Sequence, residues 1–158
     1  MINEKLNQLL SDYAVEAHKT HNFHWYVKGS TFFQVHTLLD SVYGAMYDQI
    51  DEVAELILMN EGMPLASMDE HLKNTHLKEA ADGYKDPAEI FSAILADYES
   101  IRNLAAEIKK DADAEDNYLV SAAMDEHIAA LSKTIWMIKQ SQKSQVGPSI
   151  LRTFSSRS

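Results

Sequence analysis

Hydrophobic residues recur every three or four positions along four long stretches of this chain. The four stretches are residues 3–28, 31–60, 87–110 and 115–144. The clearest stripe, in the second stretch, consists of Val35, Leu38, Leu39, Val42, Met46, Ile50, Val53 and Ile57. This spacing follows the 3.6-residue turn of an α-helix, whereas a half-buried strand would alternate with a period of two. The pattern therefore predicts four long amphipathic helices that each bury one face.

Capping residues fall between these stretches. Thr31 and Gln34 have the spacing of a capping box at the start of the second helix. Before the third helix, Asp86, Pro87 and Glu89 predict an N-cap, a proline at the first helical position and a glutamate at the third. Both helices are thus expected to begin at residues suited to a helix start.

The connection over residues 61–86 is too long for a tight turn. It allows the second and third long helices to run in the same direction, and within it Pro64–Lys78 predicts a short extra helix. The predicted fold is therefore all-α, a four-helix bundle with a short extra helix between helices two and three. We expect one domain over residues 1–146 and a flexible, basic tail over residues 147–158.

The 158-residue chain is acidic, and its charge is uneven. It carries 24 Asp and Glu residues against 14 Lys and Arg, a net charge of −10, and the chain contains no acid after Glu126. An acidic body attracts cations and repels the phosphates of DNA. We therefore expect any contact with DNA to be weak and to come from the C-terminal tail.

Residue types that are missing exclude several kinds of chemistry. The chain has no cysteine, which excludes disulfides, thiol nucleophiles and iron–sulfur clusters. Its first residues lack the pattern of a signal peptide, and no apolar run approaches the ~18 residues of a membrane helix. These features predict a cytoplasmic protein with no membrane partner.

Histidines and carboxylates on the first two helices indicate a metal site. No glutamate is followed three residues later by a histidine, so the sequence does not support a di-iron centre inside one bundle. A helical hairpin that turns at Gly29 instead places His24 level with His36, so that the two imidazoles converge. On the second helix, an arc of about 100° carries His36, Asp40, Asp51 and Glu55.

One chain cannot bring all these groups to a single ion, because His36 and Asp51 lie ~22 Å apart along an unbroken helix. A second copy of the chain can do so. If the second helix crosses its two-fold mate in the antiparallel direction, the crossing falls at Gly44 and Ala45, where small side chains permit close approach. The two histidines of one subunit then face Asp51 and Glu55 of the other. This mixed set of ligands suits Fe(II), with Zn or Mn as competitors.

The same residues also have ordinary explanations. By themselves, Asp51 and Glu55 would be a solvated pair one helical turn apart. A single inward histidine is more often a hydrogen-bonded core residue than a ligand, and we expect this of five others. These are His18, His21, His71, His76 and His127. The coincidence of two level histidines with a carboxylate face favours the metal site.

The candidate metal ligands lie within longer sequence motifs. They are residues 21–29 (His-Asn-Phe-His-Trp-Tyr-Val-Lys-Gly), followed by Phe32, Phe33, His36, Asp40, Asp51, Ala54 and Glu55. In this pattern the chain resembles the Dps family of mini-ferritins, within the ferritin-like superfamily. The resemblance covers nearly the whole chain. It implies a hollow homododecamer with two-fold shared sites that oxidises Fe(II), typically with hydrogen peroxide, stores the ferric mineral and protects DNA.

The resemblance also implies roles for individual residues. The ferroxidase ligands of the family are matched by His24, His36, Asp51 and Glu55. Asp40 matches a carboxylate near a second, weaker iron position, and Trp25 matches a tryptophan beside the site that donates electrons. The family's DNA binders often carry a lysine-rich N-terminal arm, of which only Lys5 is present, so DNA binding and association with the nucleoid are left open.

Two other functions stay open at this point. A non-enzymatic, DNA-compacting stress protein would use the bundle only as a scaffold and bind through its tail. A redox-inactive zinc-binding shell would use the same ligands without turnover. Trp25 equally suits a packing role at the subunit interface.

Overall fold

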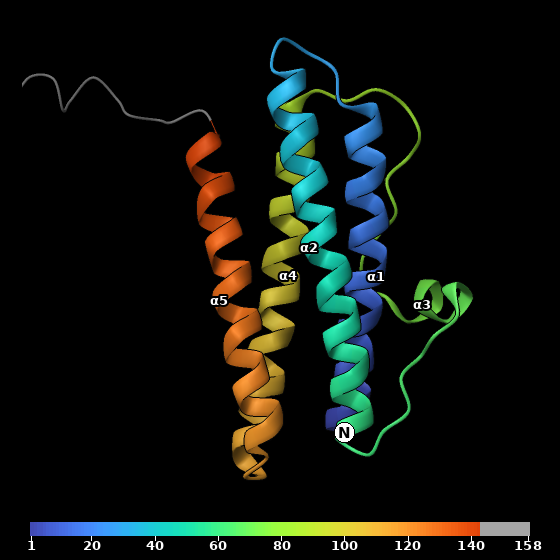
Figure 1. Ribbon diagram of the computed structural model, residues 1–158, viewed down its shortest axis with the longest axis vertical. Coiled ribbons are helices and arrows are strands. Elements are labelled where there is room, and N and C mark those ends of the chain that lie inside the picture. Colours follow the sequence, from blue (N-terminus) through green and yellow to red (C-terminus); the bar gives the residue numbers. More distant parts are fainter. Residues whose placement is uncertain (143–158) are drawn as a thin grey trace, which may run out of the picture.

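The computed structural model describes residues 1–142, and in this part of the chain all regular elements are helices. They are α1 (Ile2–Tyr26), α2 (Phe32–Met59), α3 (Met68–Asn74), α4 (Pro87–Ala114) and α5 (Tyr118–Ser141). Figure 1 shows the four long helices side by side, with the short α3 outside the bundle next to α1. The predicted all-α bundle with a short extra helix is confirmed. The predicted tail over residues 147–158, and the domain boundary before it, lie outside the described residues.

The long connection between α2 and α4 sets the topology. It carries α3 and returns the chain to the end of the bundle where α2 begins, so α2 and α4 run in the same direction (Figure 1). The end of this connection is fastened beside the α1–α2 turn by two backbone hydrogen bonds. Lys28 N–H donates to the Lys85 carbonyl at 3.0 Å, and Lys85 N–H donates to the Tyr26 carbonyl at 3.1 Å. The predicted parallel course of the second and third long helices is therefore confirmed.

The hydrophobic core runs along the axis between the four long helices. Its largest fully buried side chains include Tyr13, Phe23, Leu39, Met46, Ile57, Ile94, Ile101 and Ile108. Most of the predicted stripe on α2 is buried or half-buried, but Leu38 is 41% exposed. Within residues 1–142, none of the helices is both long enough and apolar enough to span a bilayer.

Buried polar groups fasten α3 and the segment after it to α1. The carboxylate of Asp12 accepts hydrogen bonds from the Thr75 hydroxyl at 2.7 Å and from the His76 N–H at 2.8 Å. The Ser11 hydroxyl lies 3.0 Å from Nδ1 of the buried His71 on α3. Because buried polar groups need partners, these bonds hold the connection in one position against the bundle.

The two predicted helix starts differ in outcome. The Asp86 side chain accepts a hydrogen bond from Glu89 N–H at 2.9 Å, with Pro87 in the first turn, as expected. Thr31 is also an N-cap residue, but its side chain makes no capping bond, so the predicted capping box is wrong. Thr31 has φ −102° and ψ 22°, whereas Asp86 has the extended conformation that directs a side chain toward the first free N–H groups.

Candidate metal centre

The α1–α2 hairpin brings two of the predicted ligands together. His24 lies in the last turn of α1, and His36 lies near the start of α2. Their imidazole rings are stacked, with centroids 3.6 Å apart and planes inclined by 16°. Both side chains are half-buried. The hairpin thus places the two histidines level with each other at one end of the bundle.

Reciprocal hydrogen bonds orient the two rings. His24 Nδ1 donates to the backbone carbonyl of His36, and His36 Nδ1 donates to the carbonyl of His24, both at 2.7 Å. A carbonyl can only accept, so each Nδ1 must carry the proton. In the neutral imidazole, each Nε2 then has a lone pair available to a metal ion. A carbonyl bound to the other ring nitrogen is a common way of fixing the tautomer and orientation of a metal-binding histidine.

Aromatic rings surround the histidine pair. Phe32 stacks on His36 with centroids 4.9 Å apart, and the Tyr43 ring meets His24 edge-on at 5.5 Å. His21 lies between Trp25 and Tyr43, at 4.0 and 4.1 Å from their centroids. Burial lowers the pKa of His21, which favours its neutral form. Trp25 is 54% exposed, so it lies at the surface beside the pair.

Asp40 has a partner that sequence reasoning missed. The Tyr43 hydroxyl donates to Asp40 Oδ1 at 2.5 Å. This bond raises the pKa of Tyr43, which keeps the phenol protonated and donating. Tyr43 follows Asp40 by three positions and His36 by seven, so it lies on the same face of α2. That spacing was the signal available in the sequence.

Asp51 and Glu55 lie further along α2, and both are exposed. Because α2 is unbroken between His36 and Asp51, these two residues are ~22 Å apart along its axis. In the part of the chain that the structure describes, no three His, Cys, Asp or Glu side chains are grouped so that they could hold a metal ion. A single chain therefore presents two separated halves of the predicted ligand set.

The surface of α2 between these halves is open. A Cβ atom built on Gly44 meets no heavy atom of the described residues within 4 Å, and the neighbouring Ala45 is exposed. α2 also exposes large apolar side chains along its length, namely Phe33 at 80%, Leu38 at 41%, Tyr47 at 49%, Leu58 at 57% and Met59 at 60%. The helix thus offers a small-residue surface with apolar flanks.

The five other histidines divide into two groups. His71 and His127 are buried and hydrogen-bonded, as expected of core residues. For His18 and His76 the core expectation is wrong, because both are exposed. His18 lies on the outer side of α1 with its ring 6.3 Å from Trp25, and His76 follows α3 in the connection. His21 is half-buried beside the histidine pair.

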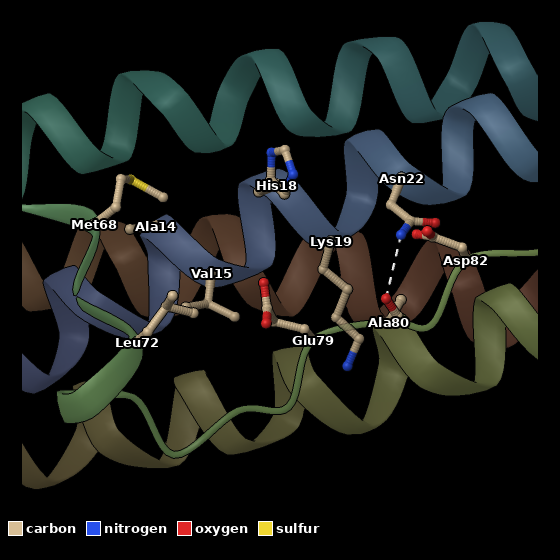
Figure 2. Close-up of a pocket in the computed structure, with 10 residues that line it drawn as sticks. All are labelled: Ala14, Val15, His18, Lys19, Asn22, Met68, Leu72, Glu79, Ala80 and Asp82. Atoms are coloured by element: carbon tan, nitrogen blue, oxygen red, sulfur yellow. Dashed lines mark hydrogen bonds between the residues drawn. The ribbon is translucent and has the colours of Figure 1, made fainter. Parts of the chain in front are cut away.

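A separate pocket lies between α1 and the connection that follows α3. Its volume is about 340 Å³. Figure 2 shows Lys19 and Asn22 of α1 beside Glu79 and Asp82 of the connection, with side chains of α3 at the opposite end. Asn22 Nδ2 donates to the Ala80 carbonyl at 3.3 Å, which closes one end. None of the predicted metal ligands lines this pocket, so it is distinct from the histidine pair.

The chain is similar in sequence to a known family and to known proteins. Residues 3–143 match the sequence model of the ferritin family, described as a ferritin-like domain. The DNA protection during starvation protein of Helicobacter pylori is 35% identical over 136 residues, which are 86% of this chain and 94% of that protein. The DNA protection during starvation protein 2 of Bacillus anthracis is 38% identical over 140 residues, 86% of this chain and 92% of the relative.

Solved structures agree with these sequence relatives. The Helicobacter cinaedi protein CAIP superimposes with a TM-score of 0.86 at 35% identity, over 89% of this chain and 99% of that chain. The Dps protein of Vibrio cholerae, described as a member of a broad superfamily of ferritin-like diiron-carboxylate proteins, has a TM-score of 0.87 at 27% identity. That match covers 90% of this chain and 89% of the Vibrio chain.

Proposed function

This chain belongs to the Dps family of ferritin-like proteins, and from that premise we propose that it oxidises Fe(II) and stores the ferric product. The observation that carries the proposal is the histidine pair. Both Nδ1 atoms are held by carbonyls, and both Nε2 atoms keep a lone pair for a metal ion. Iron is the substrate here, and imidazole with carboxylate ligands suits Fe(II). Zn and Mn would compete for the same ligands.

We assign the complete site to two subunits. His24 and His36 of one subunit bind the ion together with Asp51 and Glu55 of the partner subunit. Asp40, held by Tyr43, contributes to a second and weaker iron position. The open surface at Gly44 supports an antiparallel crossing of two α2 helices, which would bring the separated halves together. The family implies that such dimers assemble into a hollow dodecamer that holds the mineral.

The reaction requires two electrons from iron. Two Fe(II) ions each give one electron to one molecule of hydrogen peroxide, which takes up two protons and becomes two molecules of water. No hydroxyl radical is released in this balance. The net charge of −10 attracts Fe(II) to the protein. Removal of Fe(II) and peroxide together would protect DNA, the role that the names of the relatives give to those proteins.

The test is an anaerobic titration with Fe(II), followed by peroxide, while the particle mass is recorded. We expect His36→Ala and Glu55→Ala to lose rapid Fe(II) oxidation, because each removes a ligand from one half of the site. His76→Ala is the matched control, since His76 is an exposed histidine away from the pair. Oxidation by either ligand variant at the wild-type rate would contradict the assignment.

The titration, together with a zinc-binding assay and a DNA gel, separates the alternatives. A redox-inactive zinc shell would bind zinc but would not accelerate Fe(II) oxidation. A DNA-compacting protein would retard DNA in a gel in a salt-sensitive manner and would lose this on removal of residues 145–158. Fe(II) oxidation that depends on His36 and Glu55 supports the ferroxidase.

A further inference from the structure

A tyrosine and a histidine form a buried pair in the core of the bundle. Tyr13 on α1 is 0% exposed, and His127 on α5 is 5% exposed. The Tyr13 hydroxyl lies 2.9 Å from His127 Nδ1, and the two ring centroids are 5.5 Å apart. The iron chemistry proposed above uses neither residue. A phenol held against an imidazole inside a protein is an arrangement suited to moving a proton.

The surroundings define which atom donates. His127 Nε2 lies 4.0 Å from the carboxylate of Glu52 on α2, so a proton on Nε2 is favoured by that negative charge. His127 Nδ1 is then the acceptor, and the Tyr13 hydroxyl donates to it. The other charged group that acts on His127 is Glu126, its neighbour on α5. Burial raises the pKa of Tyr13 and lowers the pKa of His127, so both side chains are neutral at rest.

This pair is arranged for loss of an electron together with a proton. A buried phenol does not ionise by itself, since its anion would be poorly solvated. When the phenol loses an electron, its proton becomes strongly acidic and can pass directly to a neutral imidazole already in hydrogen-bond contact. The imidazolium that results faces Glu52, and this carboxylate compensates the new charge. Tyr98 is buried to a similar extent but is not held by a histidine in the part of the chain described.

The pair also lies close to one half of the candidate metal centre. A cavity of about 200 Å³ between α2 and α5 is lined by His127, Glu52, Glu55 and Glu126, among others. Glu55 is one of the two carboxylates assigned above to the iron site. The histidine that holds Tyr13 and the carboxylate that holds iron therefore border the same cavity.

We propose that Tyr13 is a redox-active tyrosine that supplies one electron when peroxide meets a site holding a single Fe(II). This rests on the proposed ferroxidase function. Fe(II) gives one electron and Tyr13 gives the other, and the phenol proton moves to His127 Nδ1. Peroxide takes up these two electrons and two protons from solvent, and its O–O bond breaks to yield two water molecules. The products are Fe(III), a Tyr13 phenoxyl radical and a protonated His127.

The experiment uses the assembled protein loaded anaerobically with fewer Fe(II) ions than there are sites. Peroxide is added, the sample is frozen rapidly, and electron paramagnetic resonance records the tyrosyl radical. We expect a tyrosyl signal in the wild type that disappears in Tyr13→Phe. The signal should persist in Tyr98→Phe, which is the matched control. His127→Gln keeps a hydrogen-bond acceptor but removes the base, so we expect a weaker and shorter-lived signal.

Further measurements distinguish a failure of this inference from a failure of the proposed ferroxidase function. At full iron loading, Tyr13→Phe should oxidise Fe(II) at the wild-type rate, because two Fe(II) ions then supply both electrons. Phenylalanine keeps the buried ring, and an unchanged circular dichroism spectrum and particle mass will establish that the variant is folded. Oxidation of Fe(II) without a tyrosyl signal, or with a signal that survives in Tyr13→Phe, would overturn the role of Tyr13 alone. Absence of catalysed Fe(II) oxidation in the wild type would overturn the ferroxidase itself.

Discussion

At the scale of single residues, Glu16 is an acidic side chain buried in the bundle. Its side chain is 0% exposed, and within residues 1–142 neither carboxyl oxygen has a hydrogen-bond partner that could donate to it. Burial, and then the nearby carboxylate of Asp97, raise the pKa of Glu16 well above its usual value. Asp97 is itself paired with Lys19 at 2.7 Å, so Glu16 is the member of the pair that keeps its proton. A protonated Glu16 can donate to Asp97.

This proton makes stability depend on pH. In the unfolded chain Glu16 ionises near its ordinary pKa, whereas in the folded protein it ionises only at a much higher pH. The unfolded state therefore binds fewer protons between these values, and stability falls as pH rises through this window. Glu16→Gln removes the ionisable group, so this fall in stability with pH no longer occurs, and the new amide can donate to Asp97. We expect the variant to be more stable than the wild type at pH 8 by roughly 1–3 kcal/mol, with a smaller difference at pH 5.

Urea unfolding at a single protein concentration will measure this difference at both pH values. The protein concentration is held constant because the proposed assembly would make stability depend on it. A variant that is less stable than the wild type at both pH values would show that Glu16 is charged in the folded protein.

At the scale of helices, local geometry decides whether a capping residue contributes. Asp86 and Thr31 are both residue types that cap helices, and both precede a long helix. Only Asp86 makes the capping bond, because only its backbone is extended. The Thr31 backbone instead takes part in a turn in which Phe32 N–H donates to the Gly29 carbonyl at 3.2 Å.

A matched pair of variants tests this difference. Asp86→Ala removes the acceptor for Glu89 N–H and should lower the free energy of unfolding by about 1 kcal/mol. Thr31→Ala removes no capping bond and should change it by less than about 0.5 kcal/mol. Urea unfolding followed by circular dichroism will measure both. An equal decrease in the free energy of unfolding of the two variants would show that the capping bond of Asp86 does not stabilise the protein.

At the scale of the whole molecule, the proposed iron site requires assembly of two subunits. One chain holds the histidine pair at one end of α2 and the two acids at the other, so in the proposed arrangement two copies in antiparallel contact would form two sites. In a mixed dimer of His36→Ala and Glu55→Ala subunits, one site carries both substitutions and the other carries neither. Each variant by itself has no intact site.

This predicts recovery of activity on mixing. If the two inactive variants are unfolded together in equal amounts and refolded, half of the dimers are mixed and half of their sites are intact. The mixture should therefore regain about a quarter of wild-type Fe(II) oxidation. The rate after peroxide addition measures this, and each variant refolded separately is the control. A mixture as inactive as its components would place all four ligands within one subunit.

Much of the fold follows from local pattern. The observed bounds of the long helices lie within a few residues of the predicted stretches, because helical periodicity is a property of consecutive residues. The histidine pair was also predictable, since a hairpin of known turn position fixes which residues lie level. The capping box at Thr31 was not, because the residue type does not determine the backbone angles that a turn imposes.

The sequence by itself determined the four helices, the short helix between α2 and α4, the level position of His24 and His36, and the separation of the two acids from them. Only the tertiary structure decided which histidines are buried, that Tyr13 meets His127 across the core, and that Glu16 lies beside Asp97. The reason is physical. Positions along one helix follow from its regular rise, whereas contacts between distant helices depend on how their faces pack, and neither partner alone carries that information.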